Sequence, residues 1–184
     1  MKKQNTKKKN TKKKFFTIAV SGTPGSGKTT IAKFLAKQTS GRYVDVGTFI
    51  KRNNLSEGYD RKMKCLIVDE RKLARRLERA IDEEKKNGSR GIILDSHMSH
   101  YVDPKKTDFC IITKCDLKTL KKRLHIRKYT KQKIRDNLDA EIFDVCRQEA
   151  IEEGHKVMTI ITDKEKEWKK QLQILQKDMK KTFV

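Results

Sequence analysis

A glycine-rich segment between a predicted strand and a predicted helix constrains this chain more than any other feature. Residues 22–29, GTPGSGKT, satisfy the pattern G-x-x-x-x-G-K-[ST] in full. An uninterrupted apolar and β-branched run predicts a buried strand over residues 15–21, and a helical pattern begins at Lys28. Glycines let backbone N–H groups curl around a phosphate chain, and the helix N-terminus directs partial positive charge at the same anion. The segment therefore predicts a phosphate-binding loop for a nucleoside triphosphate.

The rest of the chain alternates apolar strands with helical patterns. Beyond the first strand, strands are predicted over residues 42–46, 91–95, 109–113 and 157–161. Helices are predicted over residues 28–38, about 69–87 with Asp69 as N-cap, about 117–126, about 131–153 and 164–180. Residues 47–68 show no long period and are predicted to be an inserted, mobile segment. Strands that are apolar throughout and alternate with helices indicate an α/β fold with a parallel five-stranded sheet flanked by helices.

Length and charge limit the remaining possibilities. The 184 residues suit one domain, predicted over residues 15–184, and the formal net charge of +22 should attract RNA or phosphorylated ligands. Residues 1–14 carry eight lysines and no acid, which predicts a disordered basic arm, either a solvated tail or a weak RNA-binding arm. No apolar stretch predicts a membrane span or a signal peptide. The cysteines show no C-x-x-C pair or metal-ligand spacing, so reduced thiols in an intracellular compartment are expected at Cys65, Cys110, Cys115 and Cys146.

Two oxygen-bearing side chains are candidates for a metal site beside the loop. Lys28 can reach the β- and γ-phosphates, and the Thr29 hydroxyl can ligate Mg²⁺. Thr30 follows with a second hydroxyl in the first helical turn. Asp95, at the end of an apolar strand, suits a second magnesium partner that acts through water. The alternative is that Asp95 caps the following turn.

Histidines and basic residues supply the other candidates. The sequence fits two roles for His97: a neutral imidazole near the transferred phosphoryl group, or a structural residue. His100 suits a structural role. Two histidines alone are too few to bind zinc. Arg123 and Arg127 lie four residues apart on a predicted helix, so they share a face and can form a clamp over a triphosphate. The alternative is that both belong to a solvated basic surface of the helix. Residues 113–116, TKCD, fit a loose guanine-recognition pattern, although Asp116 would equally cap the next helix.

Taken in order, the motifs resemble one family over about residues 16–153. The matching segments are GTPGSGKTT at 22–30, GYD at 58–60, LIVDE at 66–70, IILDSH at 92–97, R-L-x-x-R-x-Y at 123–129 and KIRDNLDAEIFDV at 133–145. This pattern is similar to that of the adenylate kinase isoenzyme 6 family, also called coilin-interacting nuclear ATPases. The segment SHMSHY at 96–101 is most similar to archaeal members.

The resemblance implies a P-loop NTPase with an adenylate-kinase-like core, a monophosphate-binding segment at about residues 45–68 and a short zinc-free lid at about 126–136. It implies that Mg²⁺ and ATP bind there, that AMP is phosphorylated and ATP hydrolysed, and that small-subunit ribosomal RNA is matured in contact with a small-subunit ribosomal protein. Carried over by motif, the triphosphate site comprises Gly25, Gly27, Lys28, Thr29, Thr30 and Arg127. The candidate catalytic residues are Lys28, Asp95, Arg127 and, if its role is not structural, His97. A cytoplasmic location is expected, or a nuclear one in a eukaryote.

This sequence departs from the family pattern at several positions. Lys128 stands where many members have glycine, and neither the lysine arm nor so high a charge belongs to the pattern. Lys51 and Arg52 could hold the AMP phosphate, but no tight motif fixes either. Two other functions stay open: an ATP-driven ribosome assembly factor with little AMP kinase activity, and a GTPase.

Overall fold

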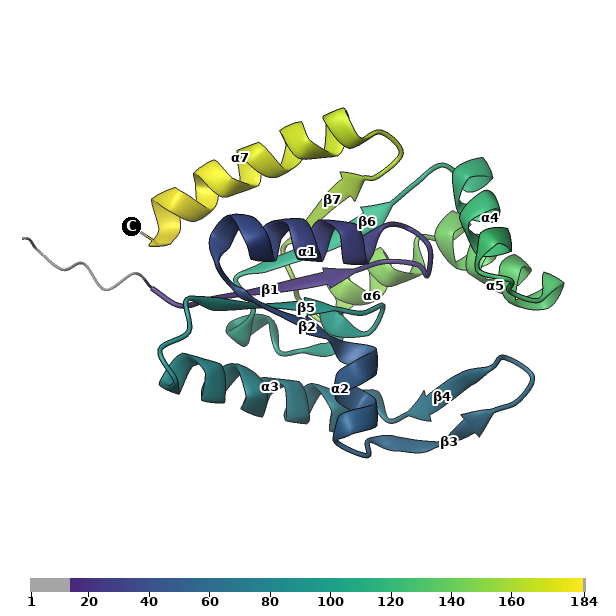
Figure 1. Ribbon diagram of the computed structural model, residues 1–184, viewed down its shortest axis with the longest axis horizontal. Helices are drawn as coiled ribbons and strands as arrows, with labels where there is room; N and C mark the ends of the chain where they lie inside the picture. The colour runs from purple at the N-terminus through teal and green to yellow at the C-terminus, as the bar shows by residue number, and fades with distance from the viewer. Residues whose placement is uncertain (1–13, 184) are drawn as a thin grey trace, which may run out of the picture.

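The computed structural model describes residues 14–183, apart from the side chains of residue 176 and of residues 178–183. Its centre is a parallel five-stranded sheet with the strand order β2-β5-β1-β6-β7 (Figure 1). The strands are β1 (Phe16–Ser21), β2 (Arg42–Asp45), β5 (Gly91–Asp95), β6 (Phe109–Lys114) and β7 (Val157–Ile161). The predicted parallel five-stranded sheet is therefore confirmed.

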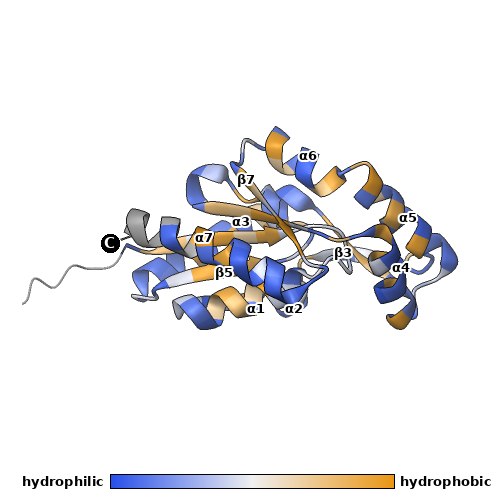
Figure 2. Ribbon diagram, turned by 90° about the horizontal axis from the view of Figure 1, so that it is seen from above, coloured by the Kyte–Doolittle hydropathy of each residue, from blue (hydrophilic) through white to orange (hydrophobic). Residues whose placement is uncertain are grey.

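Helices cover both faces of the sheet because successive strand residues point to opposite sides. Ile18 and Val20 of β1 pack in one core with α1 (Lys28–Thr39) and α7 (Glu165–Phe183). The intervening Ala19 packs instead with Ala150 of α6 (Val145–Glu152). A third core joins β5 to α3 (Glu70–Lys86), which begins after Asp69 as predicted. The apolar strands consequently run between α1 on one side and α6 on the other (Figure 2).

The segment predicted to be inserted and mobile contains regular structure. It forms α2 (Val46–Arg52) and an antiparallel hairpin of β3 (Ser56–Asp60) and β4 (Cys65–Val68). The absence of a long period over residues 47–68 thus reflects several short elements, which the sequence did not predict. These elements are too short to show a period in sequence, and the polar strand β3 owes its conformation to pairing with β4.

The predicted helix over residues 131–153 is also corrected. It is divided into α5 (Lys131–Ile142) and α6, while α4 (Leu117–Ile126) has the predicted bounds. Asp144 separates the two helices with φ of 55°, in the left-handed region. Its carboxylate accepts a hydrogen bond from Lys114 Nζ of β6 at 2.8 Å, a tertiary contact that local helical periodicity does not encode. Two 3₁₀ turns, η1 (Ser99–Tyr101) and η2 (Pro104–Lys106), follow β5.

Three sequence expectations concern the ends, the membrane and the thiols. The predicted arm at residues 1–14 lies outside the described residues, except for Lys14. Within residues 14–183, no helix is both long enough and apolar enough to cross a membrane. All four cysteines are unpaired, as expected from their spacing.

Candidate active site

The predicted phosphate-binding loop lies between β1 and α1 and needs glycine at two crowded positions. Gly22 has φ of 130°, and a Cβ atom there would lie 2.4 Å from the Thr113 carbonyl oxygen. Gly27 has φ of 102°, and its Cβ would lie 2.9 Å from Thr162 Oγ1. Both positions combine a backbone conformation that disfavours a side chain with a close neighbour. The motif glycines therefore let the loop pack tightly against β6 and the end of β7.

Lys28 spans the mouth of this loop. Its Nζ donates hydrogen bonds to the carbonyl oxygens of Gly22 at 2.7 Å and Thr23 at 3.0 Å. Burial lowers the pKa of Lys28 to about 8, with the charge of Arg127 acting in the same direction and Cys146 and Asp95 opposing. The amine therefore lies where the sequence predicts a phosphate ligand, close enough to Asp95 and Arg127 to feel their charges.

A set of contacts that the sequence did not predict braces the loop from outside. Arg123 Nη1 donates to the Gly25 carbonyl oxygen at 3.2 Å and to Thr162 Oγ1 at 3.1 Å, and its Nη2 donates to the Thr162 carbonyl oxygen at 3.0 Å. Thr162 Oγ1 in turn donates to the Ser26 carbonyl oxygen. Arg123 shares the cleft with Arg127 as expected for one helix face, but three hydrogen bonds from its two Nη atoms already go to the loop and to the turn after β7. Only knowledge of the tertiary arrangement could have paired Thr162 with this loop.

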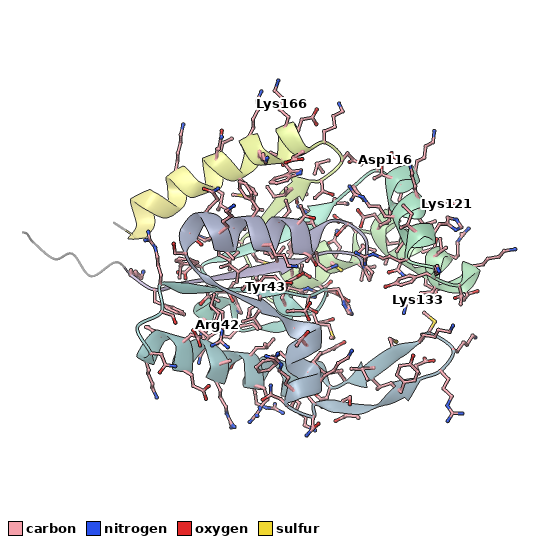
Figure 3. The ribbon with its side chains drawn as sticks, viewed as in Figure 1. Arg42, Tyr43, Asp116, Lys121, Lys133 and Lys166 are labelled. Atoms are coloured by element: carbon pink, nitrogen blue, oxygen red, sulfur yellow. The ribbon has the colours of Figure 1, made fainter. Side chains whose placement is uncertain are left out.

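Asp95 ends β5 at the floor of the cleft, close to Thr29 at the start of α1. One of its carboxylate oxygens, Oδ2, accepts a hydrogen bond from the hydroxyl of Tyr43 at 2.8 Å. Burial and this contact with Asp95 raise the pKa of Tyr43, so the phenol stays a donor. Tyr43 belongs to β2, which pairs with β5, and Figure 3 shows it at the centre of the molecule. Sequence reasoning missed Tyr43 because strand order decides which residues neighbour Asp95.

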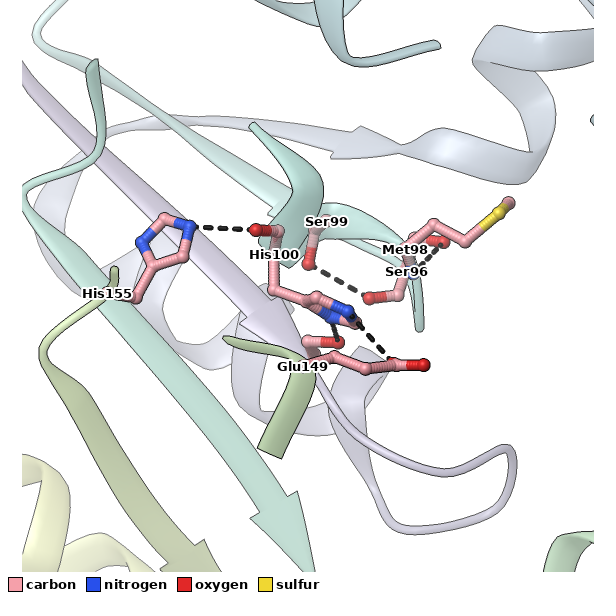
Figure 4. A network of polar contacts seen from close by, with 7 residues as sticks. Ser96, Met98, Ser99, His100, Glu149 and His155 are labelled. Carbon is pink, nitrogen blue, oxygen red and sulfur yellow. Dashed lines mark hydrogen bonds and ion pairs between the residues drawn. The ribbon is translucent and has the colours of Figure 1, made fainter. Parts of the chain in front are cut away.

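The two histidines after β5 occupy different environments. His97 lines the cleft with an exposed surface, and its partial enclosure by the cleft walls, with the charges of Lys28 and Lys133, lowers its pKa to about 4. His97 is therefore neutral near pH 7, as the predicted role beside the transferred phosphoryl group requires. His100 is fully buried, with its Nδ1 2.7 Å from Ser21 Oγ (Figure 4). His100 thus has the structural surroundings expected for it.

The predicted lid lies across the cleft from the hairpin. Arg127, at the C-terminus of α4, is exposed and lines the cleft. Lys128 follows with φ of 57°, a left-handed conformation that explains why glycine suits this position. Lys133 of α5 points toward the hairpin tip (Figure 3), where its Nζ donates to the Met63 carbonyl oxygen at 2.5 Å. The lid and the segment predicted to bind a monophosphate therefore touch.

All these parts surround one cleft of about 1530 Å³. The phosphate loop, Asp95, His97 and Arg127 form one part of its wall, and Thr48, Lys51, Leu66 and Val68 belong to another. Ligand sites usually measure about 300–1,000 Å³, so this cleft has room for two nucleotides. Of the two basic residues predicted to hold a monophosphate, Lys51 lines the cleft and Arg52 does not.

The TKCD segment is used structurally. The Thr113 hydroxyl lies 2.6 Å from Ser26 Oγ, and the Asp116 carboxylate accepts from the backbone N–H of Lys118 at 2.8 Å as the N-cap of α4. Neither residue lines the cleft. Among the described residues, no group of three or more histidine, cysteine, aspartate or glutamate side chains could hold a metal ion. A site at Thr29 and Asp95 would therefore need ligands from the nucleotide and from water.

Comparison with known proteins agrees with this geometry. A family model described as an AAA domain matches residues 18–144. The adenylate kinase isoenzyme 6 homolog FAP7 of Saccharomyces cerevisiae is 37% identical over 149 residues, which cover 79% of this chain and 73% of that protein. The adenylate kinase isoenzyme 6 homolog of Dictyostelium discoideum is 34% identical over 133 residues, 72% of this chain and 73% of that protein.

Solved structures with low sequence identity share the fold. A sugar kinase from Janibacter sp. HTCC2649 superposes with a TM-score of 0.62 at 18% identity, over 89% of this chain and 95% of that chain. Shikimate kinase from Bacteroides thetaiotaomicron does so with a TM-score of 0.54 at 16% identity, over 90% of this chain and 98% of that one. The fold is therefore that of the P-loop kinases.

Proposed function

The chain belongs to the adenylate kinase isoenzyme 6 family, and we propose that it is a nucleotide kinase that transfers the γ-phosphoryl group of ATP to AMP. One observation carries the proposal: a single cleft large enough for two nucleotides is lined by the phosphate loop and also by α2 and the hairpin. The names of the yeast and Dictyostelium discoideum relatives support the same substrate class.

Positive charge around the γ-phosphoryl group would supply most of the catalysis. Phosphoryl transfer depends on positioning and on neutralising charge, because the protein forms no covalent bond to the group. Lys28 and Arg127 lie close enough for each charge to act on the other, so both can face the same phosphate chain. His97 is neutral beside Lys28 and could orient a hydroxyl group or a water molecule.

Thr29 and Asp95 fit a magnesium ion that enters with ATP. A hydroxyl and a carboxylate are hard oxygen ligands, and Tyr43 holds the Asp95 carboxylate through Oδ2. Magnesium usually keeps several waters and few protein ligands, in agreement with so small a set. The ion would neutralise phosphate charge, and Tyr43 would fix the carboxylate that holds it.

The acceptor nucleotide would lie between α2 and the lid. Lys51 supplies a cation on that side, and Lys133 bridges from the lid to the hairpin tip. Closure of these two parts would exclude water and so suppress hydrolysis of ATP.

A coupled assay that follows ADP formation from Mg-ATP, with and without AMP, tests the proposal. AMP should raise the rate well above the ATP-only background, with two ADP formed for each ATP consumed. Slow ATP loss that AMP does not change would overturn AMP as the substrate.

Slow ATP hydrolysis and a role in small-subunit ribosome assembly extend the proposal. The net charge of +22 supports contact with ribosomal RNA. An assembly factor with little kinase activity would show poor turnover of AMP together with ATP hydrolysis that ribosomal RNA or a small-subunit ribosomal protein stimulates. A GTPase is not favoured, because Asp116 is used as a helix cap.

A further inference from the structure

A carboxylate from α6 enters the cleft at a position that the proposed phosphoryl transfer does not use. Glu149 lines the cleft, and its side chain is 35% exposed. Cys146, at the start of the same helix, lies near Lys28 and Gly22. Glu149 is three residues further on, about 4.5 Å along the helix axis. The charge of Glu70, at the start of α3 just after the hairpin, acts on both Glu149 and Tyr101, so the carboxylate lies toward the half of the cleft assigned to the acceptor nucleotide.

Two side chains from η1 hold this carboxylate in place. Nε2 of the fully buried His100 lies 3.2 Å from Glu149 Oε2 and has no hydrogen-bond partner of its own in the described structure (Figure 4). A carboxylate at this position favours the His100 tautomer protonated at Nε2, in which Nδ1 accepts from the Ser21 hydroxyl. The Tyr101 hydroxyl contacts the same carboxylate, and the Tyr101 ring packs on His100 with centroids 4.4 Å apart. Glu149 is consequently fixed from the protein side.

The remaining capacity of Glu149 is for accepting hydrogen bonds only. An ionised carboxylate offers about four lone-pair positions, of which the Tyr101 hydroxyl uses one, while His100 Nε2 lies 3.2 Å from Oε2 without completing a hydrogen bond. Apolar side chains of Val68, Met98 and Val145 line the same cleft and provide surfaces against which a planar base could pack. A flat apolar ligand with an N–H donor at its edge would therefore suit this part of the cleft.

We propose that Glu149 is the residue that selects the base of the acceptor nucleotide, by accepting a hydrogen bond from the 6-amino group of adenine. This inference rests on the proposed phosphoryl transfer to a nucleoside monophosphate. A 6-oxo purine places an acceptor oxygen opposite the carboxylate oxygen, and two acceptors facing each other in a partly desolvated site repel. The geometry thus predicts discrimination between amino and oxo purines at a single position.

The test compares AMP with inosine monophosphate, in which oxygen replaces the amino group, in wild type and in Glu149→Gln. The wild type should prefer AMP in kcat/KM by at least tenfold. The amide of the variant can turn its NH₂ group toward a 6-oxo oxygen, so the preference should fall about tenfold or more, with kcat/KM for inosine monophosphate rising. The KM for ATP should not change.

Glu153→Gln is the matched control, because Glu153 is an exposed residue of the same helix end and does not line the cleft. It should leave the ratio unchanged, and thermal melting should confirm that both variants fold. An unchanged ratio in a folded Glu149→Gln variant would overturn the inference while leaving the kinase intact. Absence of any monophosphate-dependent rate in the wild type would instead overturn the proposed function.

A second variant separates specificity from stability. Tyr101→Phe keeps the ring against His100 and removes only the hydroxyl that contacts Glu149. It should raise the KM for AMP several-fold with little change in kcat, because the carboxylate is less firmly held. A fall in kcat with an unchanged KM would contradict a role in binding the base.

Discussion

Lys133 on α5 donates a hydrogen bond from its Nζ to the carbonyl oxygen of Met63 at 2.5 Å, across the mouth of the cleft. The same ammonium group lies over the ring of Tyr129, 4.7 Å from its centroid. A single side chain thereby joins the lid to the tip of the β3–β4 hairpin, the two parts that the proposed reaction needs to close together.

Replacing Lys133 by Met should weaken this closure. We expect the KM for the acceptor nucleotide to rise several-fold and the ratio of ATP hydrolysis to transfer to increase, because water enters a poorly closed site. Steady-state kinetics with and without AMP measure both effects. Lys131→Met, at the exposed first position of the same helix, is the control and should leave both unchanged. Equal kinetics for the two variants would argue against a closing role for Lys133.

Tyr43→Phe tests whether the phenol orients Asp95. The variant loses the 2.8 Å hydrogen bond to Asp95 Oδ2 but keeps the ring. We expect the Mg²⁺ concentration for half-maximal activity to rise about tenfold, the lower end of effects seen when a partner of a metal ligand is removed. Activity titrated with Mg²⁺ at fixed ATP measures this. Tyr59→Phe, on the exposed hairpin, is the control and should titrate as wild type does. If Tyr43→Phe needs no more Mg²⁺ than Tyr59→Phe, the result would count against the metal site.

The sequence predicted those parts of the site that are contiguous along the chain. The loop from Gly22 to Thr29 could be identified because its residues bind one ligand through local backbone geometry. Asp95 could be identified because an apolar strand ends at it. Tyr43 could not, because its place beside Asp95 depends on the pairing of β2 with β5. Thr162 reaches Ser26 across 136 positions of sequence, which no local pattern reports.

The missed elements of the fold share one physical cause. Local periodicity predicts a helix through residues 131–153, yet the contact from Lys114 to Asp144 fixes a left-handed residue inside it. The polar β3 lacks the alternation of a strand and acquires its conformation from pairing with β4. In both places a long-range contact overrides the local preference.

Arg123→Ala should lower the free energy of unfolding by about 1.5–3 kcal/mol, the range for hydrogen bonds that involve a charged group. The guanidinium makes three such contacts, to Gly25 and twice to Thr162, and its removal leaves partly buried carbonyl oxygens without a donor. Urea unfolding measures the change. Lys122→Ala, at the neighbouring exposed position, should stay within about 0.5 kcal/mol of wild type. A similar loss in both variants would rule out a specific brace at Arg123.

His97 should remain uncharged throughout the neutral range. Its pKa of about 4 lies below the ordinary value of 6.5, so the unfolded chain takes up the proton first as the pH falls. The contribution of His97 to the free energy of unfolding is therefore fully present above pH 6.5 and is lost as the pH falls toward 4. An NMR titration of its ring protons, assigned by comparison with His97→Asn, should give a midpoint near 4. A midpoint at 6 or above would contradict the desolvated setting.

Lys28 supplies the sharpest test of the phosphate site. Its pKa of about 8 means that part of the protein lacks the ammonium charge in mildly alkaline solution. A bound triphosphate, already ionised at that pH, favours the charged form, so binding should take up a proton and weaken as the pH rises above 8. Calorimetry at pH 8.5 in two buffers that differ in ionisation enthalpy measures the uptake.

Lys28→Met should abolish both the proton uptake and phosphoryl transfer while the fold is retained, because the remaining loop is built by backbone contacts to β6 and to the turn after β7. Circular dichroism establishes the fold of the variant, and the ADP assay its activity. Lys37→Met, in the last turn of α1 and exposed, controls for the loss of one charge on the same helix. Turnover retained by a folded Lys28→Met variant would show that the phosphate loop does not stabilise the transferred group, and the mechanism would have to place that charge on Arg127 alone.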